Sequence, residues 1–235
     1  MIYVNANNKE QKLIYSGITF SDFMEYSQAF IKNIILLKGN FLGNKHLKNF
    51  EVMEGEEYIA NLKKEDIYSY GDFCFVDYSL SDCIYQLTNE QVAELLFMAH
   101  MYKPLKSPFF KVLSNQFAYL AHDDGYICIL YLQNMESFLG VLNSKIISAI
   151  KHITKREVKS FDISILKDLM ELAEEGLLID LNEIKKKGNI SVNAYVVGEY
   201  SDMNKVFLEK NKLKENAQTK KKLIYTNGKW NEEVF

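Results

Sequence analysis

Apolar and polar residues along the chain follow two periods, a two-residue period in short segments and a helical period in longer ones. Pairs of short apolar runs separated by polar turn residues predict β-hairpins. These hairpins are expected at 2–15, at 117–132 and at 222–234, where Asn227-Gly228 is a favoured two-residue turn. The apolar run 73–78 and the alternating run 190–197 predict two further strands.

Helices are predicted where apolar residues recur at three- and four-residue steps. The first begins at a capping pattern, Thr19 to Asp22, and continues to about Gly39, because its apolar residues fit one helical face: Phe23, Tyr26, Phe30, Ile34 and Leu37. A Thr88–Gln91 capping box opens the next helix, which ends near His100. Further helices are expected over 135–153, capped by Asn134, over 162–175, capped by Asp162, and over 201–208. The segment 44–65 is polar and weakly helical, and the polar segment 209–222 is predicted to be a solvated lysine-rich loop.

The order of these elements predicts an α+β fold of antiparallel hairpins with packed amphipathic helices, because strands and helices do not alternate as in parallel α/β proteins. A chain of 235 residues suits one domain over 1–235. The alternative is two closely packed halves with a boundary near 154–162.

The composition excludes several classes of protein. A net charge of −3, with Arg156 as the sole arginine, argues against nucleic acid as a partner. No segment resembles a signal peptide, and no run reaches the ~18–20 apolar residues of a membrane helix, so a soluble cytoplasmic protein without a membrane partner is expected. Three cysteines without zinc-like spacing predict buried reduced thiols, no metal site and no cofactor.

The tetrad His122-Asp123-Asp124-Gly125 between two apolar runs is the densest group of candidate catalytic residues. An imidazole beside carboxylates suits proton transfer or metal binding, whereas Asp-Asp-Gly also suits a simple turn. Neighbouring side chains on a strand diverge, which favours the turn. A site would require His122 to meet His100 and Asp77 across the connection that holds Pro104 and Pro108. The predicted binding residues are Asp77, Tyr119 and Tyr126.

Several of these segments together resemble a known group of proteins. The segments are Tyr70–Asp77, Glu94–Leu96, His100, Pro104-Leu105, Pro108–Phe110 and Tyr119–Gly125. They resemble an uncharacterised family of soluble bacterial proteins, common in Gram-positive genomes, that is often labelled "oxalate:formate antiporter". The resemblance is strongest over 66–132 and departs at Tyr126-Ile127-Cys128, where a tryptophan and a basic residue are expected. A transporter needs many spanning helices and this chain offers none, so the resemblance implies a grouping and no activity.

The chain also lacks the glycine-rich loops of nucleotide-binding proteins and the G-x-S-x-G motif of hydrolases. The first functional hypothesis is therefore a non-catalytic binding or regulatory protein whose partner is another protein. The alternative is a metal-assisted or His/Asp-dependent hydrolase with a pocket around His100 and His122. Nucleic-acid binding comes third.

Overall fold

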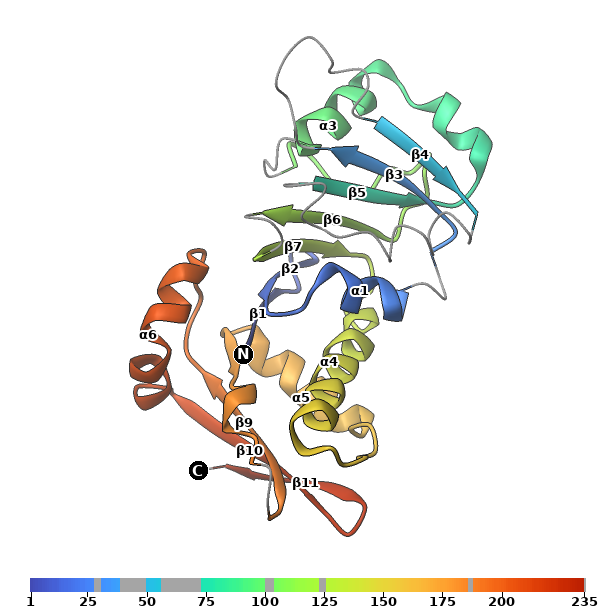
Figure 1. Cartoon of the computed structure of the whole chain (residues 1–235). Coiled ribbons are helices and arrows are strands. Elements are labelled where there is room, and N and C mark those ends of the chain that lie inside the picture. Colours follow the sequence, from blue (N-terminus) through green and yellow to red (C-terminus); the bar gives the residue numbers. More distant parts are fainter. Residues whose placement is uncertain are drawn as a thin grey trace. The chain divides into compact units, whose positions relative to one another are not determined.

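A computed structural model describes residues 1–27, 31–38, 50–55, 73–99, 104–122, 126–185 and 188–234 (Figure 1). The fold is α+β, with helices packed on antiparallel strands, as the sequence predicted. The chain divides into two compact units. Unit 1 comprises Met1–Lys9, Ile14–Ile18 and Met135–Phe235, and unit 2 comprises Glu10–Leu13 and Thr19–Asn134. The segment 154–162, the expected boundary for two halves, lies inside unit 1.

Unit 1 is built on strands in the spatial order β11-β10-β9-β8-β1-β2. The strands are β1 (Ile2–Asn7), β2 (Lys12–Ser16, whose first two residues count with unit 2), β8 (Leu177–Ile179), β9 (Ile190–Val196), β10 (Thr219–Thr226) and β11 (Lys229–Val234). The helices are α4 (Ser137–Thr154), α5 (Ile163–Ala173), the short 3-10 helix η5 (Leu181–Glu183) and α6 (Met203–Glu215). Helix α5 contacts β1, β8 and α4, so its buried face, which includes Leu166 and Leu169, joins the core of this unit.

Unit 2 has strands in the spatial order β7-β6-β5-β3-β4. The strands are β3 (Asn33–Lys38), β4 (Phe50–Glu54), β5 (Phe73–Tyr78), β6 (Phe117–His122) and β7 (Ile127–Leu132), and the helices are α1 (Phe20–Ser27), the 3-10 helix η3 (Ser81–Gln86) and α3 (Asn89–Ala99). Both faces of this sheet are covered. Aromatic rings from α1 pack on one face, and Leu95 and Met98 of α3 pack on the other.

The aromatic face of unit 2 shows why β5 and β6 are so rich in large residues. Phe75 stacks on Tyr119 with ring centroids 5.0 Å apart, and Phe23 of α1 lies 5.7 Å from Phe117. The alternate residues of the same strands, such as Val76 and Leu120, belong to the opposite core. A strand buried on both faces is apolar at every position, so its sequence loses the alternation that marks a half-exposed strand.

That loss of alternation explains why the first predicted helix is wrong beyond Ser27. Helix α1 ends there, and the apolar run that follows forms β3 between β4 and β5. All four residues Ile34–Leu37 are buried. Their spacing from Phe23 fits a helix by coincidence, whereas a continuous run of β-branched and leucine residues suits a central strand.

Three smaller predictions are also corrected. Helix α6 extends to Glu215 and β10 begins at Thr219, so 209–222 is not a loop. Helix α4 starts at Ser137 with Glu136 at its N-cap, two residues after the expected cap Asn134. In the segment 44–65, expected to be weakly helical, Phe50–Glu54 form strand β4 and Gly55 follows it, and the other residues lie outside the described part of the chain.

The predicted capping box at Thr88–Gln91 and the predicted turn at Asn227-Gly228 are confirmed. In the Thr88–Gln91 capping box, the Gln91 amide donates to the Thr88 hydroxyl at 3.3 Å and the Thr88 amide donates to Gln91 Oε1 at 3.0 Å. Asn227 and Gly228 have φ values of 51° and 77°, as a type I′ hairpin turn requires. Within the described part of the chain, no helix combines the length and the apolarity needed to cross a membrane.

Candidate functional site

The tetrad lies where the 117–132 hairpin turns. Strand β6 ends at His122, which pairs with Ile127 at the start of β7, so the hairpin itself is confirmed. The His122 side chain is half-buried. Asp123, Asp124 and Gly125 lie outside the described residues, and so does His100.

The structure does not bring His122 and Asp77 together. Strands β5 and β6 are antiparallel with Val76 opposite Ala118 and Phe73 opposite Ala121, so Asp77 of β5 lies beside the beginning of β6, whereas His122 is at its end. At about 3.4 Å per residue, the two ends of this strand are about 17 Å apart. Asp77 and His122 therefore do not line a common pocket, as the polar pocket expected from Asp77, His122 and His100 would require.

Asp77 instead holds the backbone where β6 begins. Its side chain is 8% exposed and accepts hydrogen bonds from the Gln116 amide at 2.9 and 3.0 Å and from the Phe117 amide at 2.8 Å. Burial raises the pKa of Asp77 to about 6, against the effect of these amides, which lower it. The carboxylate has a clear structural task, the satisfaction of amides at a strand end.

The two predicted tyrosines have different environments. Tyr119 is fully buried, and its hydroxyl lies 3.1 Å from the Sγ of Cys128. Tyr126 is 62% exposed beside the hairpin turn. Of the two, Tyr126 is the one whose ring is open to a partner.

The cysteines are buried and reduced, as the sequence predicted. Burial raises the pKa of the Cys74 thiol, which suppresses the reactive thiolate. Among the described residues, no group of three His, Cys, Asp or Glu side chains is placed to hold a metal ion.

An apolar pocket of about 200 Å³ lies in unit 2. We call it the apolar pocket, and its lining consists of Ile35, Val52, Ile84, Leu87, Val92 and Leu95. Ile35 and Leu95 belong to the hydrophobic core of the unit, whereas Val52 on β4 is 46% exposed. The pocket is therefore an opening onto the core between the sheet and α3.

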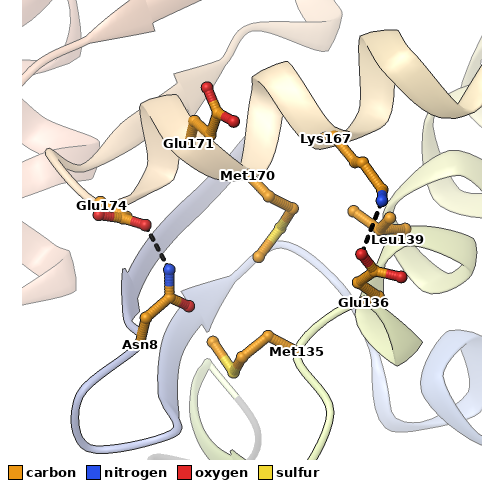
Figure 2. Close-up of a pocket in the computed structure, with 8 residues that line it drawn as sticks. All are labelled: Asn8, Met135, Glu136, Leu139, Lys167, Met170, Glu171 and Glu174. Atoms are coloured by element: carbon orange, nitrogen blue, oxygen red, sulfur yellow. Dashed lines mark hydrogen bonds and ion pairs between the residues drawn. The ribbon is translucent and has the colours of Figure 1, made fainter.

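A second pocket, of about 310 Å³, lies in unit 1 and has a mixed lining (Figure 2). We call it the methionine pocket, and its lining consists of Asn8, Met135, Glu136, Leu139, Lys167, Met170, Glu171 and Glu174. In Figure 2 the Met135 and Met170 side chains face each other between two polar pairs. Lys167 forms an ion pair with Glu136 at 2.7 Å, and the Asn8 amide donates to the Glu174 carboxylate.

A network of partly buried charges also lies in unit 1. The Lys214 ammonium of α6 donates to Asp180 at 2.7 Å and to Glu183 at 2.8 Å, and Glu183 accepts from the Tyr195 hydroxyl at 2.7 Å. Burial alone would raise the pKa of Asp180 and of Glu183, but the Lys214 ammonium and neighbouring donors outweigh it and lower both. Each charge has its partner within the network, which points to a role in stability.

Sequence reasoning missed both pockets and the Lys214 network. The helix predicted after the Thr88–Gln91 capping box contains Val92 and Leu95, but no sequence signal showed that Val52 and Ile84 would line a pocket with them. Comparison of the chain with protein-family models, with curated proteins and with solved structures gave no match.

Proposed function

We propose that this is a cytoplasmic, non-catalytic binding protein that acts through protein–protein contacts, and that the apolar pocket receives an apolar side chain of its partner. The observation that carries the proposal is the lining of the pocket, six aliphatic side chains around about 200 Å³. An anchor residue inserted there would extend the hydrophobic core of unit 2, and such anchors supply most of the energy of many protein interfaces.

The size and chemistry of the pocket favour an amino-acid side chain over a substrate. Pockets for small molecules and cofactors usually span about 300–1,000 Å³ and include a few polar groups that orient the ligand. The apolar pocket is smaller, and none of its six lining side chains can donate a hydrogen bond or transfer a proton. These properties fit one leucine-sized or phenylalanine-sized side chain presented by another protein.

The charge around the apolar pocket indicates which residues of the partner lie next to the inserted side chain. The sequences of β4, η3 and α3 contain five acidic residues and no lysine, arginine or histidine. Lys106 pairs with Glu90 and Glu94, while Glu54 and Asp82 have no lysine partner among the described residues. A partner segment with basic residues beside its apolar anchor would complement this surface and would bind more weakly at high salt.

The hydrolase alternative has less geometric support. Its polar pocket depended in part on Asp77 meeting His122, but Asp77 on β5 lies beside the first residue of β6, whereas His122 is the last residue of β6. Asp77 is also occupied by two backbone amides. The binding function needs no such convergence.

The test is a comparison of captured proteins. The purified chain and its Val52→Gln and Val92→Gln variants are immobilised and incubated with lysate of the source cells, and the bound proteins are quantified by mass spectrometry. Loss of an anchor contact costs about 2 kcal/mol or more of binding free energy, which is a loss of affinity of about 30-fold or more. Each variant should therefore lose most of a partner that the unmodified chain captures in stoichiometric amount.

The matched control is Leu80→Gln, because Leu80 is an exposed aliphatic residue that does not line the apolar pocket. Circular dichroism establishes that all variants are folded. The proposal is wrong if no protein is captured in stoichiometric amount, or if the pocket variants and the control capture it equally.

A further inference from the structure

We infer that the methionine pocket of unit 1 is a binding site for a small organic amine with an aliphatic tail. The argument begins from the shape of the lining. Lys167, Met170 and Glu174 recur at three- and four-residue steps and therefore share one face of α5. Glu136 and Leu139 lie three residues apart at the start of α4 and close the pocket from another side.

The pocket has an apolar middle and polar ends. Figure 2 shows Met170 and Met135 facing each other in the middle, the Lys167–Glu136 pair at one end and the Asn8–Glu174 pair at the other. Lys167 and Glu174 are seven residues apart, which corresponds to about 10 Å along the axis of α5. Methionine side chains adapt to varied apolar shapes, so this middle suits a flexible aliphatic chain.

The two ends differ in their charge balance. At the Lys167 end, the positive and negative charges already neutralise each other. At the other end, Glu171 and Glu174 form no ion pair with a described lysine, and the last turn of α5 contains no basic residue. Carboxylates at a helix C-terminus face the negative end of the helix dipole, so a cation bound at this end of the pocket would be stabilised by both the carboxylates and the dipole.

An ammonium group at Glu174 would supply that cation. The Asn8 amide donates to Oε1 of Glu174, and a carboxylate has further lone pairs that can accept from an ammonium. The aliphatic tail would then lie along Met170, Met135 and Leu139. It would end before the Lys167–Glu136 pair, where Lys167 would repel a second ammonium. The ligand class is therefore a monoamine, with a tail of about five or six carbons, given the ~10 Å between the ends.

The test uses n-hexylamine as the probe and methionine methyl groups as reporters. The chain has 8 methionines, and ¹³C-methyl labelling followed by Met→Leu substitution assigns the signals of Met135 and Met170. Titration with n-hexylamine should shift these two signals saturably and leave the signal of buried Met24 in unit 2 unchanged. Methylamine, which lacks the tail, and hexanoate, which lacks the ammonium, should bind at least about tenfold more weakly.

Two variants locate the ammonium. Glu174→Gln keeps the acceptor for Asn8 but removes the charge, and it should weaken n-hexylamine binding about tenfold or more. Glu175→Gln makes the same change one residue further along, outside the pocket lining, and should leave the affinity within about twofold. Equal binding of hexanoate, unsaturable shifts, or equal affinity of the two variants would overturn the inference. The apolar pocket of unit 2 has no part in this experiment, so the outcome is independent of the proposed function.

Discussion

Replacement of Asp77 by asparagine is expected to change the pH dependence of stability in a defined direction. Asp77 is buried near the end of β5, beside the start of β6, and its pKa is raised from 3.8 to about 6 because burial disfavours the charged carboxylate. A group with a raised pKa binds its proton more readily in the folded state than in the unfolded state between these two values. The folded state is therefore more stable at low pH, and this contribution is lost as the pH rises from about 4 to about 6.

The magnitude follows from the size of the shift. A rise from 3.8 to about 6 is slightly more than two pH units, and each unit corresponds to about 1.4 kcal/mol, so ionisation of Asp77 costs the folded state about 3 kcal/mol. The side chain of asparagine does not ionise in this pH range, and it keeps an oxygen that can accept a hydrogen bond from the Phe117 amide, as Oδ1 of Asp77 does. Relative to the unmodified chain, Asp77→Asn should gain about 3 kcal/mol in its free energy of unfolding between pH 4 and pH 7.

The assay is urea denaturation of both proteins at intervals from pH 4 to pH 7.5, with the difference in unfolding free energy plotted against pH. Asp82→Asn, on the exposed first turn of η3, is the control for the loss of one negative charge. The reasoning would be refuted if the difference were flat or moved in the opposite direction. That result would mean that the two amide donors outweigh burial and hold the pKa of Asp77 at or below its ordinary value.

Two further predictions concern unit 1. Lys214→Met should lower the free energy of unfolding at pH 7 by about 3 kcal/mol, because it leaves two carboxylates without their cation, and Lys212→Met on the exposed face of α6 is the control. Those carboxylates have lowered pKa values, so the difference should shrink as the pH falls below about 4; a constant difference would contradict the role of the ion pairs. Gly176→Ala should cost about 3 kcal/mol or more in urea denaturation, because Gly176 has a φ of 82° and a Cβ there would lie 1.9 Å from a backbone carbonyl oxygen. Gly188→Ala has a similar φ of 84° with open space around it and should cost only about 1 kcal/mol, so equal losses at the two glycines would show that the close contact is unimportant.

Local patterns predicted the elements whose cause is local. The Thr88–Gln91 box and the Asn227-Gly228 turn depend on hydrogen bonds and backbone angles within a few residues, and both formed as expected. The α+β class followed from the order of such elements. The segment Ile34–Leu37 was misassigned because its partners β4 and β5 lie elsewhere in the chain, and burial on both faces removes the period on which the assignment relies.

The candidate sites depended on distance in space, which the sequence does not contain. Asp77 and His122 are each where the strand pattern put them, at the ends of β5 and β6, but the antiparallel register separates them by the length of β6. Lys214 reaches Asp180 across 34 residues of chain, and Met135 faces Met170 only because α4 and α5 pack together. The sequence by itself therefore determined the fold class, the hairpins and the Thr88–Gln91 capping box. Tertiary packing alone decided which side chains meet, because contacts between distant segments depend on strand register and helix packing and not on local periodicity.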